Sequence, residues 1–178
     1  MKESKVAGYL ALIGTAQFLI LMIVAEALYP GYSVKNNYIS DLGVGSTAII
    51  FNVSVALLGV LVIVASILMR KVFSYASYLV LLNGIGALIV GLFPETTGLP
   101  HLIGALLAFF FGGLAAIFTS IRRNYFWTVL GVITLISLFL YMGKMYGPLG
   151  NGGLERLIVY PELVWGISLG TYLIELKE

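Results

Sequence analysis

The residues of this chain whose side chains could do chemistry fall in or near three polar stretches between long apolar runs. These stretches cover residues 30–43, 94–101 and 147–162. Together they offer carboxylates, one imidazole, one guanidinium and hydroxyl groups, which suit general acid–base work and the binding of a charged group. The candidate residues are Glu26, Ser40, Asp41, Asn52, Glu95, His101, Glu155, Arg156, Tyr160 and Glu162.

Their residue types suggest distinct roles. If the protein is an enzyme, His101 is the general acid or base, and Asp41 or Glu95 orients its ring. Arg156 then binds a phosphate or carboxylate. The other candidates are assigned to ligand binding, namely Glu26, Ser40, Asn52, Glu155, Tyr160 and Glu162.

Spacing relates the candidates in the last polar stretch. Glu155 and Glu162 are seven positions apart, which places them on one helix face about 10 Å apart in depth. Arg156 and Tyr160 are four apart and form a neighbouring stripe. Pro161 removes a backbone hydrogen bond and is expected to kink the helix beside Glu162.

Each candidate also has a purely structural interpretation. Arg156 could form a buried ion pair that fixes helix positions, with Asp41 and Glu155 as the expected ionised partners and Glu162 as a further one. Glu26 could extend its carboxylate to the membrane interface.

His101 could simply hydrogen-bond a neighbouring loop. The two tryptophans, Trp127 and Trp165, are expected to be interface anchors.

Several kinds of site are excluded or disfavoured by composition. The chain has no cysteine and one histidine, so thiol chemistry and cysteine-based metal sites are excluded, and we expect no metal or cofactor. Its few basic residues are scattered, which is not the pattern of a nucleic-acid-binding surface.

Composition also decides the class of protein. The chain is 60% hydrophobic and 10% charged, with a mean hydropathy of +1.04. A water-soluble domain of this composition would expose large apolar patches, so the chain is an integral membrane protein. Its apolar runs are continuous rather than alternating, which favours helices over a barrel.

The predicted fold is an all-α bundle of six transmembrane helices in a single domain, residues 1–178. The first run is expected to be a retained span and not a cleaved signal peptide, because it is too long. The predicted spans are Val6–Tyr29, Thr47–Met69, Phe73–Phe93, Pro100–Ile121, Tyr125–Met145 and Leu154–Glu175.

The distribution of Lys and Arg predicts the orientation. With a cytoplasmic N-terminus, seven basic residues lie inside and three lie outside, which fits the positive-inside rule. Both termini are then cytoplasmic in a plasma-membrane protein, and the three polar stretches face outward. The inside residues are Lys2, Lys5, Arg70, Lys71, Arg122, Arg123 and Lys177, and the outside residues are Lys35, Lys144 and Arg156.

The first outer link is expected to contain a short interfacial helix over Val34–Leu42. Ser33 would cap its start and Gly43 would end it. Its apolar side would dip into lipid or rest on the bundle.

Small residues spaced four apart predict close helix packing. Span four carries Gly104, Ala108, Gly112 and Ala116, and span three carries Asn83, Ala87 and Gly91. Such stripes allow close backbone approach in a membrane, so spans three and four are expected to form a tight central pair.

The polar motifs resemble those of the DUF998 family of archaeal and bacterial six-span membrane proteins, whose function is unknown. The matching runs cover nearly the whole chain in the expected order. They are Pro30-Gly31-Tyr32, Ile39–Gly43, Phe51-Asn52, Gly91–Pro94 with His101, and Leu154-Glu155-Arg156 with Trp165.

A looser resemblance links the chain to membrane hydrolases of the ceramidase and adiponectin-receptor type. It rests on Ser40, Asp41 and His101. That resemblance implies a zinc site built from several histidines. Here position 105 is alanine and no second histidine exists, so the resemblance does not extend to the zinc site.

Three functions remain open from the sequence. The leading hypothesis is an outward-facing polar pocket that binds or processes a lipid headgroup or small amphiphile, with membrane lipids as partners. The second is a proton-coupled transporter or permeation path, in which Glu26 and Glu162 carry protons. The third is a structural subunit that assembles with itself or with another membrane protein, without catalysis.

Overall fold

The computed structural model describes residues 2–176, and all regular structure among them is helical. Lys177, one of the basic residues expected on the inner side, lies outside the described residues. Six long apolar helices account for most of the chain. They are α1 (Lys2–Leu28), α2 (Ala48–Leu68), α4 (Ala76–Leu92), α5 (Leu99–Ser120), α6 (Tyr125–Met142) and α7 (Gly150–Glu175).

The remaining elements are single turns in the links. They are α3 (Arg70–Phe73) and the 3₁₀ helices η1 (Ser40–Gly43), η2 (Glu95–Thr97) and η3 (Gly147–Leu149). Each predicted span therefore corresponds to one long helix. The largest differences are at the starts of α1 and α7, which begin four residues before the predicted Val6 and Leu154, and in α7 this is because Gly150–Gly153 continue the helix.

Five of the six long helices are long and apolar enough to cross a membrane. The exception is α4, which has 17 residues and a length of about 25 Å at 1.5 Å per residue. A typical hydrocarbon core is about 30 Å thick. The protein is thus an all-α, multi-pass membrane protein.

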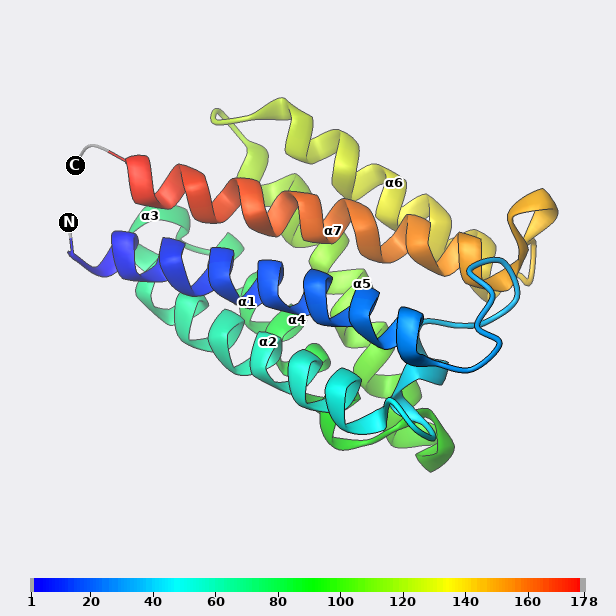
Figure 1. The fold of residues 1–178 in the computed structure, drawn as a ribbon. Helices are drawn as coiled ribbons and strands as arrows, with labels where there is room; N and C mark the ends of the chain where they lie inside the picture. The colour runs from blue at the N-terminus through cyan, green and yellow to red at the C-terminus, as the bar shows by residue number, and fades with distance from the viewer. Residues whose placement is uncertain (1, 177–178) are drawn as a thin grey trace.

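The long helices run antiparallel to their sequence neighbours, and α1 begins at the end of the bundle where α7 finishes (Figure 1). We call this end the terminal end. The opposite end carries links 29–47, 93–98 and 143–149, and we call it the link end.

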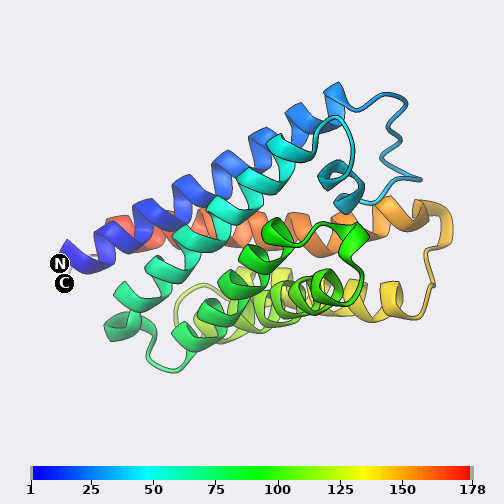
Figure 2. The same cartoon turned by 90° about the horizontal axis from the view of Figure 1, so that it is seen from below.

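Five of the helices close a ring in the order α1, α2, α4, α5 and α7. Successive members are in contact, and α7 returns to α1. The sixth long helix, α6, packs from outside onto α5 and α7. Figure 2 shows α1 and α2 side by side above α4 and α5.

Glycines bring the ring helices into backbone contact. A Cβ on Gly86 of α4 would lie 2.2 Å from the Ala108 nitrogen of α5, and a Cβ on Gly59 of α2 would lie 2.4 Å from the Leu88 nitrogen of α4. The expected close pairing of α4 and α5 is therefore present. Gly91, assigned to the same stripe, instead meets Ala56 of α2, because α4 is packed between two helices.

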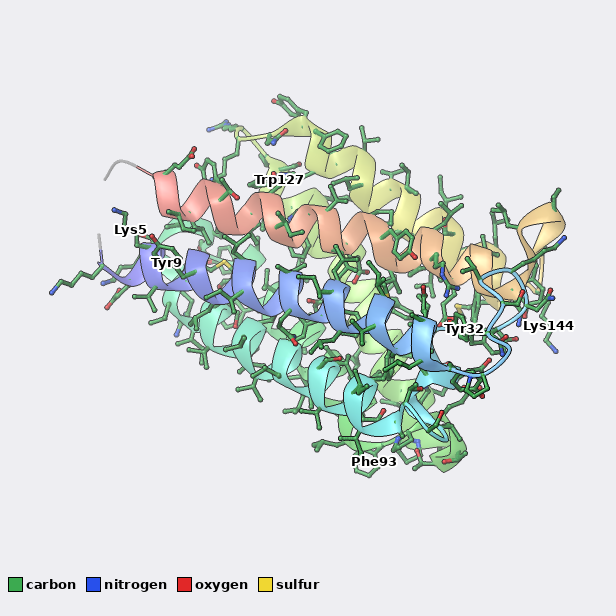
Figure 3. All side chains as sticks on the ribbon, viewed as in Figure 1. Lys5, Tyr9, Tyr32, Phe93, Trp127 and Lys144 are labelled. Atoms are coloured by element: carbon green, nitrogen blue, oxygen red, sulfur yellow. The ribbon has the colours of Figure 1, made fainter. Side chains whose placement is uncertain are left out.

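Both tryptophans lie inside the protein, so the expectation that they anchor the interface is wrong. Trp127 is 0% exposed and Trp165 is 3% exposed. Each indole N–H donates within the bundle, Trp127 to the Ser168 hydroxyl at 2.8 Å and Trp165 to the Thr119 hydroxyl at 3.1 Å. Figure 3 shows Trp127 well away from the link end, where Tyr32 and Lys144 lie.

The interfacial helix predicted over Val34–Leu42 does not form. The segment consists of turns followed by η1, because side chains compete for its backbone N–H groups. The Asn37 side chain accepts from the Ser33 N–H, and the Asp41 carboxylate accepts from the Tyr38 N–H.

Candidate functional site

Arg156 is the centre of the polar contacts at the link end. It lies in the first turns of α7, is 3% exposed, and donates through both terminal nitrogens. Nη2 bonds the Glu26 carboxylate at 2.5 Å and the Tyr32 hydroxyl at 2.7 Å. Nη1 bonds the carbonyl oxygens of Val34 and Gly152. The ion pair therefore exists, but its partner is Glu26 of α1 and not Asp41, Glu155 or Glu162.

Link 29–47, called the link from here on, contributes Tyr32 to this cluster. Its hydroxyl accepts from Arg156 and donates to the Tyr38 carbonyl oxygen at 3.0 Å. Burial raises the pKa of Tyr32 to about 12, although the Arg156 guanidinium acts in the opposite direction. The hydroxyl therefore stays protonated and able to donate at neutral pH.

Glu155 holds the middle of the link. Its side chain is buried, and its Oε2 accepts the backbone N–H of Ile39 at 2.5 Å. Asp41, expected nearby as a second partner of Arg156, is engaged inside the link instead. Its carboxylate accepts from the Asn37 side-chain amide at 2.9 Å and from the Tyr38 N–H at 3.0 Å.

Two glycines let the link lie directly on α7. A Cβ on Gly150 would lie 2.4 Å from the Lys35 carbonyl oxygen, and one on Gly152 would lie 2.1 Å from that of Asn37. The Gly152 N–H also donates to the Lys35 carbonyl at 3.0 Å. The glycine-rich run at 147–153 is therefore a docking surface for the link as well as a turn.

Beneath the link, a cavity of ≈ 110 Å³ lies inside the ring of five helices. It extends from Ile39 and Ser40 at the link end to Met69 and Leu169 toward the terminal end. None of its described lining residues belongs to α6, consistent with the position of that helix outside the ring. Most of the wall is apolar, with contributions from Phe18, Phe51, Val55, Leu58, Val62, Val80, Ala87, Val90, Phe109, Val159 and Leu163.

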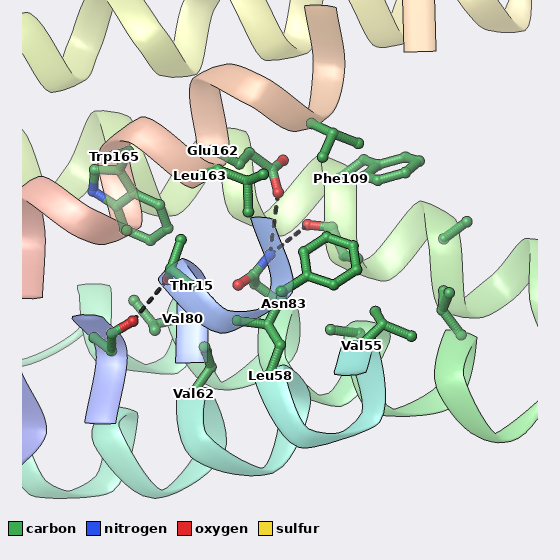
Figure 4. Close-up of a pocket in the computed structure, with 18 of the residues that line it drawn as sticks. Thr15, Val55, Leu58, Val62, Val80, Asn83, Phe109, Glu162, Leu163 and Trp165 are labelled. Atoms are coloured by element: carbon green, nitrogen blue, oxygen red, sulfur yellow. Dashed lines mark hydrogen bonds between the residues drawn. The ribbon is translucent and has the colours of Figure 1, made fainter. Parts of the chain in front are cut away.

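Polar groups enter the cavity wall at two levels. At the link end, Ser40, His101 and Glu155 line the cavity. Near the middle of the helices, Asn83 of α4 faces Glu162 of α7, as Figure 4 shows. The Asn83 amide donates to the Ala108 carbonyl at 2.9 Å and to Glu162 Oε2 at 3.4 Å.

His101 is half-buried in the first turn of α5. Its Nδ1 lies 2.8 Å from the Phe93 carbonyl oxygen. Since a carbonyl oxygen only accepts, Nδ1 carries a proton and donates in this contact, which leaves Nε2 as the acceptor in a neutral ring. A backbone carbonyl thus orients the ring, in the place expected for Asp41 or Glu95.

Six of the ten candidate residues lie outside the described cavity wall. Asn52 donates to the Gly43 carbonyl at 2.9 Å, and Tyr160 is 38% exposed on the outer surface of α7. In place of the single polar pocket that was expected, the structure has two features, an ionic cluster under the link and a mostly apolar cavity below it. The candidates away from the wall are Glu26, Asp41, Asn52, Glu95, Arg156 and Tyr160.

Sequence reasoning missed the apolar character of the central space. Thr15, Trp165 and Gly166 line it, yet none carries a local signal of a site. Glu162 lies at the middle of α7, because that helix begins at Gly150, before the predicted Leu154. Within residues 2–176, no group of three or more His, Asp or Glu side chains could hold a metal ion.

The protein is a multi-pass membrane protein. A ring of apolar helices surrounds its central cavity, and a polar link covers one end. The family described as protein of unknown function (DUF998) matches residues 12–172, so the chain belongs to the DUF998 family. No curated protein and no solved structure matched the chain in the corresponding searches.

Proposed function

We propose that this protein binds a slender amphiphile, with the hydrocarbon part in the central cavity and the polar head at the link end. The observation that supports the proposal most directly is the cavity itself. It is apolar along most of its length and has a cluster of polar groups, Ser40, His101 and Glu155, where it reaches the link.

The size and lining of the cavity suit a hydrocarbon segment. Engineered cavities of about 150 Å³ lined by Leu, Ile and Phe stay dry and bind benzene. The present cavity is somewhat smaller, at ≈ 110 Å³, and it is drawn out along the bundle. A short segment of a single alkyl chain therefore fits the space, and a diacyl lipid does not.

The charges around the cavity favour a neutral or cationic head. Two carboxylates, Glu155 and Glu162, line the wall, and no Lys or Arg occurs among the described lining residues. Arg156, predicted to hold a phosphate or carboxylate, is occupied by Glu26, Tyr32 and two carbonyl oxygens. A phosphate head would thus find no Lys or Arg in the described cavity wall to balance its charge.

We infer further that all six long helices cross the membrane and that the link end faces outward. The basic residues support this orientation, since Lys2, Lys5, Arg70, Lys71 and the Arg122–Arg123 pair gather at the terminal end. The ligand would then come from the outside or from the outer leaflet. Both termini would be cytoplasmic.

The experiment is to identify what co-purifies with the protein in a mild detergent, using native mass spectrometry and solvent extraction. Ala105→Leu adds volume to the cavity wall one turn from His101. The matched control is Ala27→Leu, which adds the same volume on the exposed surface of α1. We expect the wild type and Ala27→Leu to retain an alkyl amphiphile, and Ala105→Leu to lose most of it.

Equal retention by all three proteins would place the ligand outside the cavity and contradict the proposal. A wild type that is empty after purification and binds neither added dodecylamine nor dodecanol would contradict it as well.

One observation favours a second candidate function, proton-coupled transport. Glu162 and Asn83 lie near the middle of their helices, the depth at which transporters hold substrates and coupling ions. In vesicles with a pH-sensitive dye inside, added dodecylamine would then drive a proton flux above that of protein-free vesicles, and Glu162→Gln would abolish this excess. The same flux in the variant would exclude Glu162 as the proton carrier.

A further inference from the structure

The environment of the Glu162 carboxyl group is unusual for the interior of a membrane protein. Its Oε2 has one long hydrogen bond, 3.4 Å from the Asn83 amide nitrogen. Its Oε1 is buried and has no hydrogen-bond partner among the described residues. A buried polar atom without a partner costs free energy, and native structures contain few of them.

The bundle is shaped to hold this carboxyl group. A Cβ on Gly112 of α5 would lie 2.5 Å from Cδ, Oε1 and Oε2 of Glu162. Only a glycine at position 112 leaves this space, so the carboxyl group rests against the α5 backbone. An acid inside a span marks a functional site by default, because its burial is costly.

The opposite side of the group faces the cavity. Glu162, Asn83 and Thr15 line the same section of the wall, and Figure 4 shows Glu162 and Asn83 facing each other across it. Thr15 is not available as a donor, because its hydroxyl donates to the Ala11 carbonyl at 2.7 Å. The hydrogen-bond partner that Oε1 lacks therefore has to come from a molecule in the cavity.

We propose that Glu162 and Asn83 bind a hydrogen-bond donor carried by the amphiphile, a primary amine or a hydroxyl group. This inference rests on the proposed function and specifies its ligand class. A primary amine or a hydroxyl group can donate to a carboxylate oxygen and can also accept the proton of a neutral carboxyl group, so it is a partner for Oε1 in either form. When the carboxyl proton moves to an amine, the ammonium formed balances the carboxylate charge, and no Lys or Arg of the described cavity wall does so.

A second polar level fits the same kind of ligand. Glu155 and Glu162 both line the cavity and are seven residues apart on α7, which corresponds to about 10 Å along the helix. A chain with a donor group at each level, such as an amino alcohol, would occupy both. A chain with one donor would bind at Glu162, because Glu155 already accepts from the Ile39 N–H and Glu162 Oε1 has no partner.

The test compares three probes with identical C12 chains, dodecylamine, dodecanol and dodecanoic acid. Binding to the purified protein is measured by native mass spectrometry and by thermal shift in detergent. Three variants accompany the wild type. Glu162→Gln keeps the shape of the side chain, Gly112→Ala displaces the carboxyl group, and Glu95→Gln is a control acid outside the cavity wall.

We expect wild type and Glu95→Gln to bind the amine and the alcohol about tenfold or more tightly than the acid, as a charge-assisted hydrogen bond implies. In Glu162→Gln and Gly112→Ala, the amine should lose about tenfold in affinity, and its advantage over dodecanoic acid should disappear. An amine affinity that is unchanged in Glu162→Gln would overturn the inference.

The outcomes separate this inference from the proposed function. If Glu162→Gln binds the amine as the wild type does, while Ala105→Leu binds no probe, the cavity is a ligand site and Glu162 is not its recognition group. If no probe binds the wild type, both proposals fail.

Discussion

The guanidinium of Arg156 and the carboxylate of Glu26 lie 2.5 Å apart, although 130 positions separate the two residues in the sequence. This ion pair joins the first and last helices of the ring directly under the link. At the terminal end the same two helices meet through glycines, since a Cβ on Gly8 would lie 2.7 Å from the Gly170 carbonyl oxygen. The seam between α1 and α7 is thus fixed at both ends, by charge at one and by close packing at the other.

Removing the guanidinium should weaken this seam strongly. Arg156→Ala leaves the Glu26 carboxylate and two carbonyl oxygens without their donor, and breaking a buried pair costs about 3–5 kcal/mol. We expect the thermal midpoint in detergent to fall by more than about 5 °C at pH 7.5. Differential scanning fluorimetry measures the change.

A matched variant tests the cause. Arg156→Lys keeps the charge but cannot reach all four acceptors, so its midpoint should fall between those of Arg156→Ala and the wild type. A midpoint as low as that of Arg156→Ala would show that the charge paired with Glu26 does not stabilise this region.

The two adjacent glycines of α7 provide a second prediction. Gly152→Ala would place a methyl group 2.1 Å from the Asn37 carbonyl oxygen, whereas the nearest atom at Gly153 is the Leu149 Cβ at 3.1 Å. Gly152→Ala should therefore lift the link and destabilise the protein by about 1–3 kcal/mol. Gly153→Ala should be neutral or slightly stabilising, because alanine favours the helix by about 1 kcal/mol.

Limited proteolysis distinguishes the two variants further. A lifted link should be cleaved within residues 30–43 in Gly152→Ala and should stay protected in Gly153→Ala. Equal protection in both proteins would contradict the direct docking of the link on α7.

The sequence predicted the helices well, because a membrane span leaves a strong signal in composition. Each long apolar run became one helix, with ends within about four residues. The first half of the α5 stripe, Gly104 and Ala108, also predicted the contact with α4 correctly, whereas Gly112 meets Glu162 of α7. These features depend on local composition or on spacing along a single helix.

The partners of individual side chains were not predictable in the same way. Glu26 and Arg156 are on different helices, and only the order of the ring decides that α1 and α7 are neighbours. Asp41 does not pair with Arg156, because its carboxylate already accepts hydrogen bonds from the Asn37 side chain and the Tyr38 N–H. The cavity left no signal, since it is formed by apolar faces of five helices that each resemble ordinary packing surfaces.

The backbone contact between α4 and α5 leads to a third prediction. Gly86→Ala would place a methyl group 2.2 Å from the Ala108 nitrogen, a backbone atom that cannot move by rotating a side chain. The two helices must separate, at a cost of about 1–3 kcal/mol. The control is Gly143→Ala, whose nearest contact is 3.4 Å. Thermal midpoints that fall equally in both variants would contradict the close approach.

The orientation of the bundle gives the last prediction, and the natural absence of cysteine makes it simple to test. Asn36 is an exposed residue of the link, and Arg123 is an exposed residue at the terminal end. If the terminal end is cytoplasmic, Asn36→Cys in intact cells should react with a membrane-impermeant maleimide. Arg123→Cys should react only after the membrane is permeabilised. The opposite pattern would place the link end in the cytoplasm and move the proposed entry of the amphiphile to the inner leaflet.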